Sequence, residues 1–211
     1  MSRLSSYNKG ATRIQREKQE LILEAALEVF AANGFRGSTI DQISEAAGMS
    51  KPNLLYYFST KEDIHKKLIE RLMDNWLAPL KHINALGDPV EEIRSYIRRK
   101  LQMSRDFPRE SRLFANEILQ GAPRITVMIK NDLKIMVDEK AAIIQGWMDR
   151  GKLIQADPRH LLFAIWATSQ HYADFDIQVA AVLGTSYSKD KCFDDAQSTI
   201  TTILVNGLRA N

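Results

Sequence analysis

Residues 39–58 read TIDQISEAAGMSKPNLLYYF, and this stretch decides the fold of the first part of the chain. Thr39 and Gln42 have the spacing of a capping box, so they predict that a helix begins there. Gly48 suits a turn that needs a positive φ. Ser50 can then cap a second short helix, whose first turn tolerates Pro52. The pattern is helix, tight turn, helix.

The second short helix has a polar and aromatic surface once its leucines face inward. In a helix-turn-helix unit this helix enters the major groove of DNA with its N-terminus first. Lys51, beside Ser50, suits a phosphate because backbone N–H groups also point outward at a helix N-terminus. Asn53 can pair with an adenine edge. Tyr56 and Tyr57 suit a phosphate or a thymine methyl group, and partial burial against the preceding helix is the alternative.

Thr39 and Lys61 complete the predicted DNA-binding set. Lys61 belongs to Ser59-Thr60-Lys61-Glu62, a second capping-box pattern that opens a longer helix. Its ammonium is therefore also expected at a helix N-terminus, where it suits a phosphate. A three-helix bundle that binds no nucleic acid can contain the same turn, so that alternative stays open.

Apolar residues recur with a helical period along nearly the whole chain, and no alternating strand pattern is present. We therefore expect an all-α fold of nine helices. Gly and Pro residues divide them. The expected ranges are 12–33, 39–48, 51–58, 61–80, 89–106, 108–121, 124–149, 158–183 and 189–208.

Two domains are expected, an N-terminal arm with a three-helix unit (1–60) and a helical bundle (61–211). No flexible linker separates them, because the helix at Lys61 follows the first unit directly. Ile64, Leu68, Leu72 and Trp76 recur every four residues along that helix. We expect one rigid helix to join the domains.

The composition is that of an ordinary globular protein, with 45% hydrophobic and 26% charged residues among 211. Cys192 is the sole cysteine, so no intramolecular disulfide can form, which favours a reducing compartment. The chain lacks a signal-peptide core and a membrane-spanning apolar run. We expect a cytoplasmic protein, associated with the nucleoid when it binds DNA. Residues 1–18 hold five basic residues against one acidic, which fits either a phosphate-binding arm or a solvated tail.

Catalysis has no support in the sequence. His65, His82, His160 and His171 lack the spacing of a metal site, and neither a phosphate-binding glycine loop nor a nucleophile elbow is present. We therefore expect no catalytic residue, no metal and no cofactor.

A ligand site is predicted in the C-terminal bundle. The helix from Pro158 is almost wholly apolar through Ala167, and a run of polar residues follows it. Buried polar groups need partners, which a small ligand can supply. Trp76, Trp166 and Tyr172 offer flat faces for a planar heterocycle. Gln170 carries a donor and an acceptor, and His171 and Glu117 are further polar candidates. The alternatives are a core position for Trp76 and a dimer interface for Gln170 and His171.

Residues 22–61 resemble the DNA-binding domain of the TetR family of transcriptional repressors. The resemblance rests on Ala25-Ala26, Phe30, Gly34-Phe35, Thr39, Ile43, Ala46-Ala47-Gly48, Ser50, Leu54–Phe58 and Lys61. It implies a nine-helix homodimer that binds palindromic operator DNA. It also implies a C-terminal domain for ligand binding and dimerisation.

The resemblance extends to family members that control pyrimidine utilisation. It rests on Trp76–Lys81, Ser104–Asp106, Asp138–Lys140, Asp157-Pro158 and Ile165–Phe175. It implies a repressor that leaves its operator when uracil or thymine binds, with Trp76, Trp166, Gln170 and Tyr172 at the ligand. Two alternatives remain: a TetR-type repressor that responds to a different small molecule, and a helical adaptor that binds only protein.

Dimerisation is expected through the last two helices. The apolar positions that we expect at this interface are Phe163, Val179, Val182, Ile200, Ile203 and Leu204.

Overall fold

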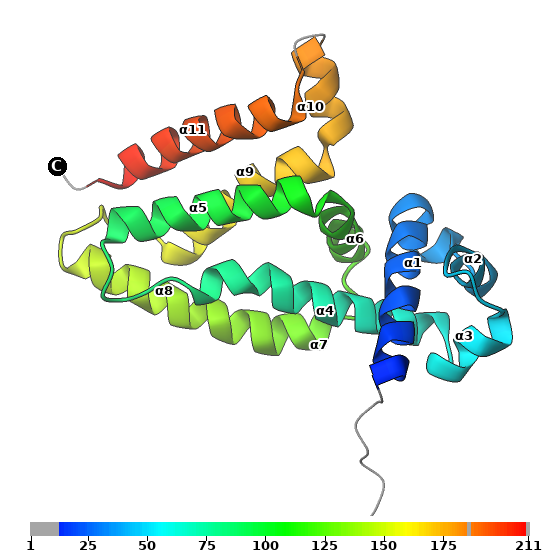
Figure 1. The fold of residues 1–211 in the computed structure, drawn as a ribbon. Coiled ribbons are helices and arrows are strands. Elements are labelled where there is room, and N and C mark those ends of the chain that lie inside the picture. Colours follow the sequence, from blue (N-terminus) through cyan, green and yellow to red (C-terminus); the bar gives the residue numbers. More distant parts are fainter. Residues whose placement is uncertain (1–12, 185–186, 210–211) are drawn as a thin grey trace, which may run out of the picture. The chain divides into compact units, whose positions relative to one another are not determined.

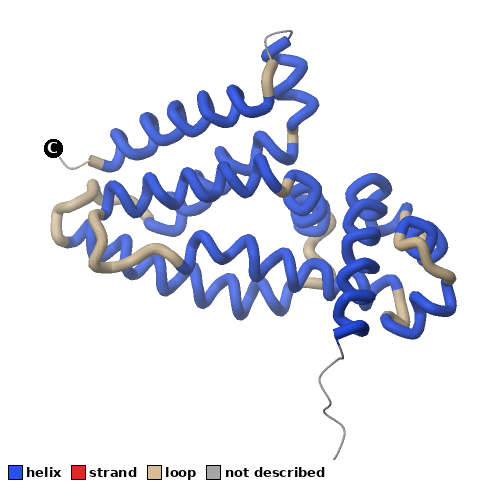
Figure 2. The backbone as a smooth tube through the Cα atoms, viewed as in Figure 1, coloured by secondary structure: helices blue, strands red, loops and turns tan. Residues whose placement is uncertain are grey.

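The computed structural model describes residues 13–184 and 187–209. Within these ranges the chain forms helices joined by turns (Figure 1; Figure 2). An isolated backbone bridge joins Leu153 and Arg209. The all-α prediction is confirmed. Residues 1–12 of the predicted basic arm lie outside the described residues, and its other basic residues, Arg13, Arg16 and Lys18, belong to the first helix. The chain forms two compact units that divide between Leu68 and Ile69.

The first unit contains α1 (Arg13–Gly37), α2 (Ile40–Ala46), α3 (Lys51–Tyr57) and the start of α4 (Lys61–Lys81). Helix α1 packs against α2 and α3. Ile22, Phe30, Ile43 and Leu54 are completely buried between them. Leu55, which we expected to anchor α3 beside Leu54, is 38% exposed, because successive helical residues point in directions about 100° apart.

Local sequence signals fix the ends of these helices. Thr39 and Gln42 form the predicted capping box at α2, and Gly48 takes φ +62 in the turn before α3. Ser50 lies at the N-cap of α3 but makes no capping hydrogen bond with its side chain. At α4 the reciprocal bonds join Thr60 and Asp63, at 3.1 and 3.0 Å, one residue later than the predicted pair of Ser59 and Glu62.

The predicted domain boundary lies between residues 60 and 61, at the start of α4, whereas the compact units divide inside this helix. Helix α4 therefore supplies residues to both units. The second unit contains the rest of α4 and the helices that follow it. These are α5 (Pro89–Asp106), α6 (Pro108–Leu119), α7 (Thr126–Met128), the π-helix η1 (Ile129–Leu133), α8 (Lys134–Asp149), α9 (Pro158–Asp174), α10 (Asp176–Leu183) and α11 (Lys189–Leu208).

The helix expected over residues 158–183 is two helices, α9 and α10, which meet at Phe175. Contacts with α6 explain the break. Asp174 accepts a hydrogen bond from Ser111 at 2.5 Å, and Asp176 pairs with Arg112 at 3.0 Å. Helical periodicity alone cannot show such tertiary contacts.

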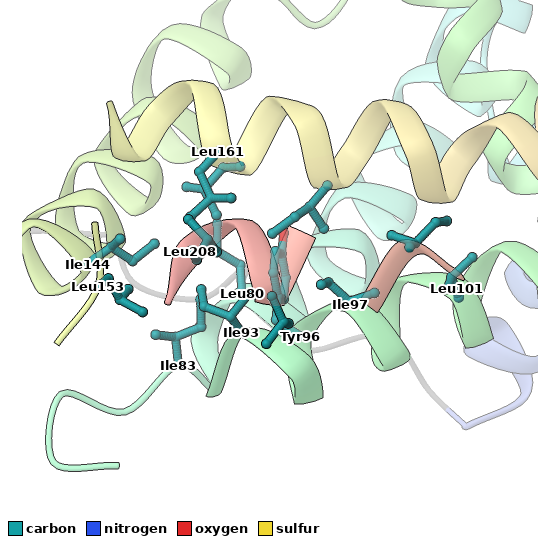
Figure 3. Close-up of a cluster of buried hydrophobic side chains, with 14 of the residues drawn as sticks. Leu80, Ile83, Ile93, Tyr96, Ile97, Leu101, Ile144, Leu153, Leu161 and Leu208 are labelled. Atoms are coloured by element: carbon teal, nitrogen blue, oxygen red, sulfur yellow. The ribbon is translucent and has the colours of Figure 1, made fainter. Parts of the chain in front are cut away.

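The core of the second unit surrounds α5, which lies beside α9 and α11 (Figure 1). Ile93, Ile97, Ile144 and Ile165 are completely buried there, and Figure 3 shows part of this cluster. No helix among the described residues is long and apolar enough to cross a membrane.

Candidate DNA-binding surface and ligand cavity

The predicted DNA-binding residues lie on or beside α3 and are mostly open to solvent. Thr39, Ser50, Lys51 and Asn53 are exposed. Tyr56 is 72% exposed, and its ring meets that of Tyr57 edge-on at 5.1 Å between centroids. Tyr57 is half-buried, so Tyr56 is the more accessible of the two tyrosines.

Lys51 forms an ion pair with Asp41 of α2. Its Nζ lies 3.0 Å from Oδ2, and both side chains are about half exposed or more, at 49% and 69%. Exposed pairs of this kind contribute only about 0–1 kcal/mol. A phosphate can therefore replace Asp41 as the partner of Lys51 at little cost.

Lys61 has a different setting from the one expected. Its Nζ donates hydrogen bonds to the backbone carbonyls of Phe35, at 2.8 Å, and Ser38, at 2.7 Å. The ammonium also lies 4.4 Å from the centroid of the Phe35 ring. These contacts hold the segment between α1 and α2 in place. The predicted position at a helix start is correct, and the charge there faces the protein's own carbonyl oxygens.

A cavity lies in the second unit, and the empty space in it and at its opening to solvent is about 370 Å³. Three of the predicted ligand residues meet there: Trp76 from α4, and Trp166 and Gln170 from α9. The other lining residues come from α4, α5, α6 and η1. They are Met73, Leu77, Tyr96, Lys100, Phe114 and Leu133.

Indole and phenol groups supply polar atoms to the cavity. Trp166 Nε1 donates to the hydroxyl oxygen of Tyr96 at 2.6 Å, which orients both rings. Burial raises the pKa of Tyr96, so this phenol stays neutral and keeps its own O–H as a donor. Trp76 is only 9% exposed, and its Nε1 has no hydrogen-bond partner among the described residues. A buried donor without a partner is costly and indicates a place for a ligand acceptor.

Lys100 is the charged residue of the cavity, and it is not among the ligand-binding residues predicted from the sequence. The residue is 2% exposed, and its Nζ lies 4.6 Å from the centroid of the Trp76 ring. Burial lowers the pKa of Lys100 to about 7, and the negative charge of Asp174 opposes part of this shift. A usable signal was present, because Lys100 stands on the apolar stripe of its helix, four residues after Tyr96 and three after Ile97.

Glu117, His171 and Tyr172 do not line this cavity. Glu117 is 3% exposed, and its carboxylate accepts bonds from the backbone and the guanidinium of Arg124, at 3.0 and 2.9 Å. The pair closes the turn after α6. His171 is exposed and stacks on Phe175, and with Tyr172 it borders a separate groove toward α11. Both follow Gln170 on α9 and point in other directions around the helix.

Large apolar side chains are exposed on α9, α10 and α11. They include Phe163 at 47%, Val182 at 79% and Ile203 at 65% exposure. Ile200, expected at a dimer interface, is 7% exposed and belongs to the core, and Leu204 packs partly against the same core. Within the described ranges, no group of three His, Cys, Asp or Glu residues could hold a metal ion.

The first unit has the helix-turn-helix form with which many transcriptional regulators enter the major groove of DNA. Residues 22–68 match the family model of the bacterial regulatory proteins of the tetR family. Residues 69–211 match the C-terminal region of the YcdC-like proteins, a TetR-type C-terminal family. The chain belongs to the TetR family of transcriptional regulators.

Known proteins agree with this assignment. The chain is 46% identical over 192 residues to the HTH-type transcriptional regulator RutR of Escherichia coli K12, and the match covers 91% of each chain. It is 34% identical over 77 residues to the transcriptional repressor NicS of Pseudomonas putida, 36% of each chain. The relatives are regulators rather than enzymes, which confirms the predicted class.

Solved structures share the fold at low identity. The transcriptional regulator SCO4942 of Streptomyces coelicolor has a TM-score of 0.73 and 20% identity, over 92% of this chain and 99% of its own. AibR, solved with isovaleryl coenzyme A and operator DNA, has a TM-score of 0.69 and 18% identity, over 89% of this chain and 98% of its own.

Proposed function

We propose that this TetR-family regulator is a homodimeric repressor of pyrimidine utilisation genes, and that uracil or thymine releases it from operator DNA. The observation that carries the proposal is the cavity in which Trp76, Trp166 and Gln170 meet. The 46% identity to RutR over most of the chain supports it.

The chemistry of the cavity fits a small planar heterocycle. Trp76 and Trp166 offer aromatic faces for a flat ring. The amide of Gln170 has both a donor and an acceptor, which match the neighbouring C=O and N–H groups of a uracil edge.

On DNA, the proposed contacts come from α3 and its surroundings, with Thr39, Ser50, Lys51, Asn53, Tyr56 and Tyr57 as the contact residues. A two-fold dimer binds a palindromic operator when its recognition helices are about 34–36 Å apart, one DNA turn. In this proposal Lys61 supports α2 through its bonds to Phe35 and Ser38, and any phosphate contact that it makes is secondary. The protein would act at operators in the bacterial cytoplasm.

Helix α4 provides the proposed coupling between ligand and DNA. Thr60 caps its first turn, and Trp76 lies at the cavity fifteen residues after Lys61. A ligand that displaces Trp76 acts on a helix whose beginning belongs to the DNA-binding unit. The coupling free energy in such systems is typically about 1–3 kcal/mol, and it must be reciprocal.

Calorimetric titration of the purified protein with uracil, thymine and cytosine tests the effector. We expect heat with uracil or thymine, and release of a labelled operator by the same compound. Absence of heat with all three, in protein shown to be folded, would exclude a pyrimidine effector and leave the family assignment unchanged. Uracil that weakens DNA binding while DNA leaves uracil binding unchanged would contradict the coupling.

A second candidate is a repressor that responds to a larger molecule. An open groove lined by Arg112 and Asn116 shares Phe114 and Gln170 with the cavity, so a longer effector could occupy both. If this second candidate is correct, the three pyrimidines give no heat in the titration, whereas a larger effector binds.

A further inference from the structure

Lys100 is the lysine in the described ranges that is buried, and it needs an explanation. A buried ammonium is costly unless it is paired. Its neighbour across the cavity is the face of Trp76, at 4.6 Å, which stabilises a cation less well than a carboxylate does. Neither of the nearby ion pairs, Arg112–Asp176 and Arg124–Glu117, includes it.

Asp174 of α9 is the acidic group whose charge acts on Lys100. The carboxylate of Asp174 already accepts a hydrogen bond from Ser111 of α6, at 2.5 Å, and the charges of Arg112 and His171 also act on it. Burial raises the pKa of Asp174, whereas the hydrogen bond from Ser111 and the charges of Arg112, Lys100 and His171 lower it. Helices α4 and α6 present Trp76 and Phe114 to the cavity, neither of which is charged.

The polar groups that line the cavity are mostly hydrogen-bond donors. Lys100 Nζ, Trp76 Nε1, the Tyr96 hydroxyl and the Gln170 amide nitrogen can all donate. The oxygen of Tyr96 already accepts a bond from Trp166, so the Gln170 oxygen is the main side-chain acceptor left. A donor-rich cavity fits a ligand that carries several acceptors.

We propose that Lys100 anchors the effector by donating a hydrogen bond from its ammonium to a ring carbonyl oxygen, so that the cavity selects a dioxo-pyrimidine over an amino-pyrimidine. This inference rests on the proposed function and adds the residue that determines specificity. Uracil and thymine carry two carbonyl acceptors. Cytosine has an amino group in place of one of them, and that group would face donors.

Proton uptake is the signature of this contact. Because burial lowers the pKa of Lys100 to about 7, part of the empty protein is neutral at that residue near pH 7. A carbonyl oxygen that accepts a bond from the ammonium favours the charged form. Effector binding therefore takes up protons from the solution.

The test is calorimetry on the full-length protein at pH 7, in two buffers with different ionisation enthalpies. We expect uracil to bind with net proton uptake, and cytosine to bind at least about ten-fold more weakly. Lys100→Met should weaken uracil binding about ten-fold or more and abolish the uptake. Lys152→Met, at an exposed lysine after α8, removes the same charge and should change neither.

Operator binding without effector shows that each variant is folded. If Lys100→Met does not fold, Lys100→Gln replaces it, because glutamine keeps a neutral hydrogen-bond donor. Wild-type protein that binds uracil without proton uptake would overturn the role of Lys100 and leave the proposed function standing. Unchanged uracil affinity in Lys100→Met, or proton uptake that persists in Lys100→Gln, would do the same. No binding of any pyrimidine by wild-type protein would overturn both proposals.

Discussion

At the scale of single residues, the surroundings of three lysines give them different properties. Lys51 is half exposed and pairs weakly with Asp41, Lys61 bonds to backbone carbonyls, and Lys100 is buried against an indole ring. The sequence places all three on helices. It does not reveal which of them is available to an external anion, because that depends on tertiary neighbours.

Lys51→Ala should weaken operator binding and flatten its salt dependence. If Lys51 neutralises one phosphate, its loss changes the slope of log affinity against log salt by about 0.9. Operator titrations at several salt concentrations measure the slope, with Lys152→Ala as a control of equal charge. A slope identical to that of the wild type would remove Lys51 from the set of phosphate contacts.

The free energy of unfolding should rise with pH above about 7 because of Lys100. The pKa of its ammonium is about 7 in the folded protein and 10.5 in the unfolded chain, so between these values the unfolded chain binds the additional proton. Stability then increases with pH across that window, and the effect is constant below it. Urea unfolding of wild type and Lys100→Met at several pH values isolates this residue. Parallel pH curves for the two proteins would exclude the effect.

The candidate cavity was partly predictable from the sequence. Trp76, Trp166 and Gln170 were found because an aromatic or polar residue at a buried helical position is itself a signal. Glu117 and His171 carry the same kind of signal but do not line this cavity. Glu117 is satisfied by Arg124, and His171 faces away, and only the packing of α6 and α9 decides this.

At the scale of the elements, capping decides where the short helices begin. Thr39 makes a reciprocal capping box with Gln42, whereas Ser50 occupies the equivalent position of α3 without a side-chain bond. The two residues form a natural matched pair, since both are exposed hydroxyl residues at N-caps of seven-residue helices.

Thr39→Ala should lower the free energy of unfolding by about 1 kcal/mol, because it removes the hydroxyl that accepts a hydrogen bond from the backbone N–H of Gln42. Ser50→Ala should cost clearly less. Chemical denaturation of both variants, read by circular dichroism, makes the comparison. Equal losses would show that the capping box contributes nothing specific.

Helix limits were the best-predicted feature because Gly and Pro act locally. Pro89, Pro108 and Pro158 each begin a helix where the sequence placed one. The break at Phe175 was missed, since the residues around it are compatible with a continuous helix. Bonds from Ser111 and Arg112 of α6 determine it instead.

At the scale of the whole molecule, dimerisation requires an apolar surface that the single chain leaves exposed. Ile203 of α11 is 65% exposed and fits that requirement, whereas Ile200 lies in the core. The sequence could not separate the two, because both belong to the apolar positions of one helix.

If Ile203 lies in the interface of the proposed dimer, Ile203→Asp should give a monomer and weaken operator binding strongly, because a buried unpaired charge is costly at an apolar interface. Analytical ultracentrifugation gives the mass in solution. Val127→Asp is the control, at an apolar residue of α7 that is 73% exposed. An Ile203→Asp protein that remains dimeric would place the interface elsewhere.

Because α4 is one continuous helix, the number of residues between Lys61 and Trp76 has consequences of its own. Fifteen positions of the sequence of α4 separate Lys61 from Trp76. One inserted residue between them would turn the indole by about 100° around the helix axis and advance it by about 1.5 Å. In the proposed coupling, the number of residues in this stretch therefore matters as much as the side chains at either end.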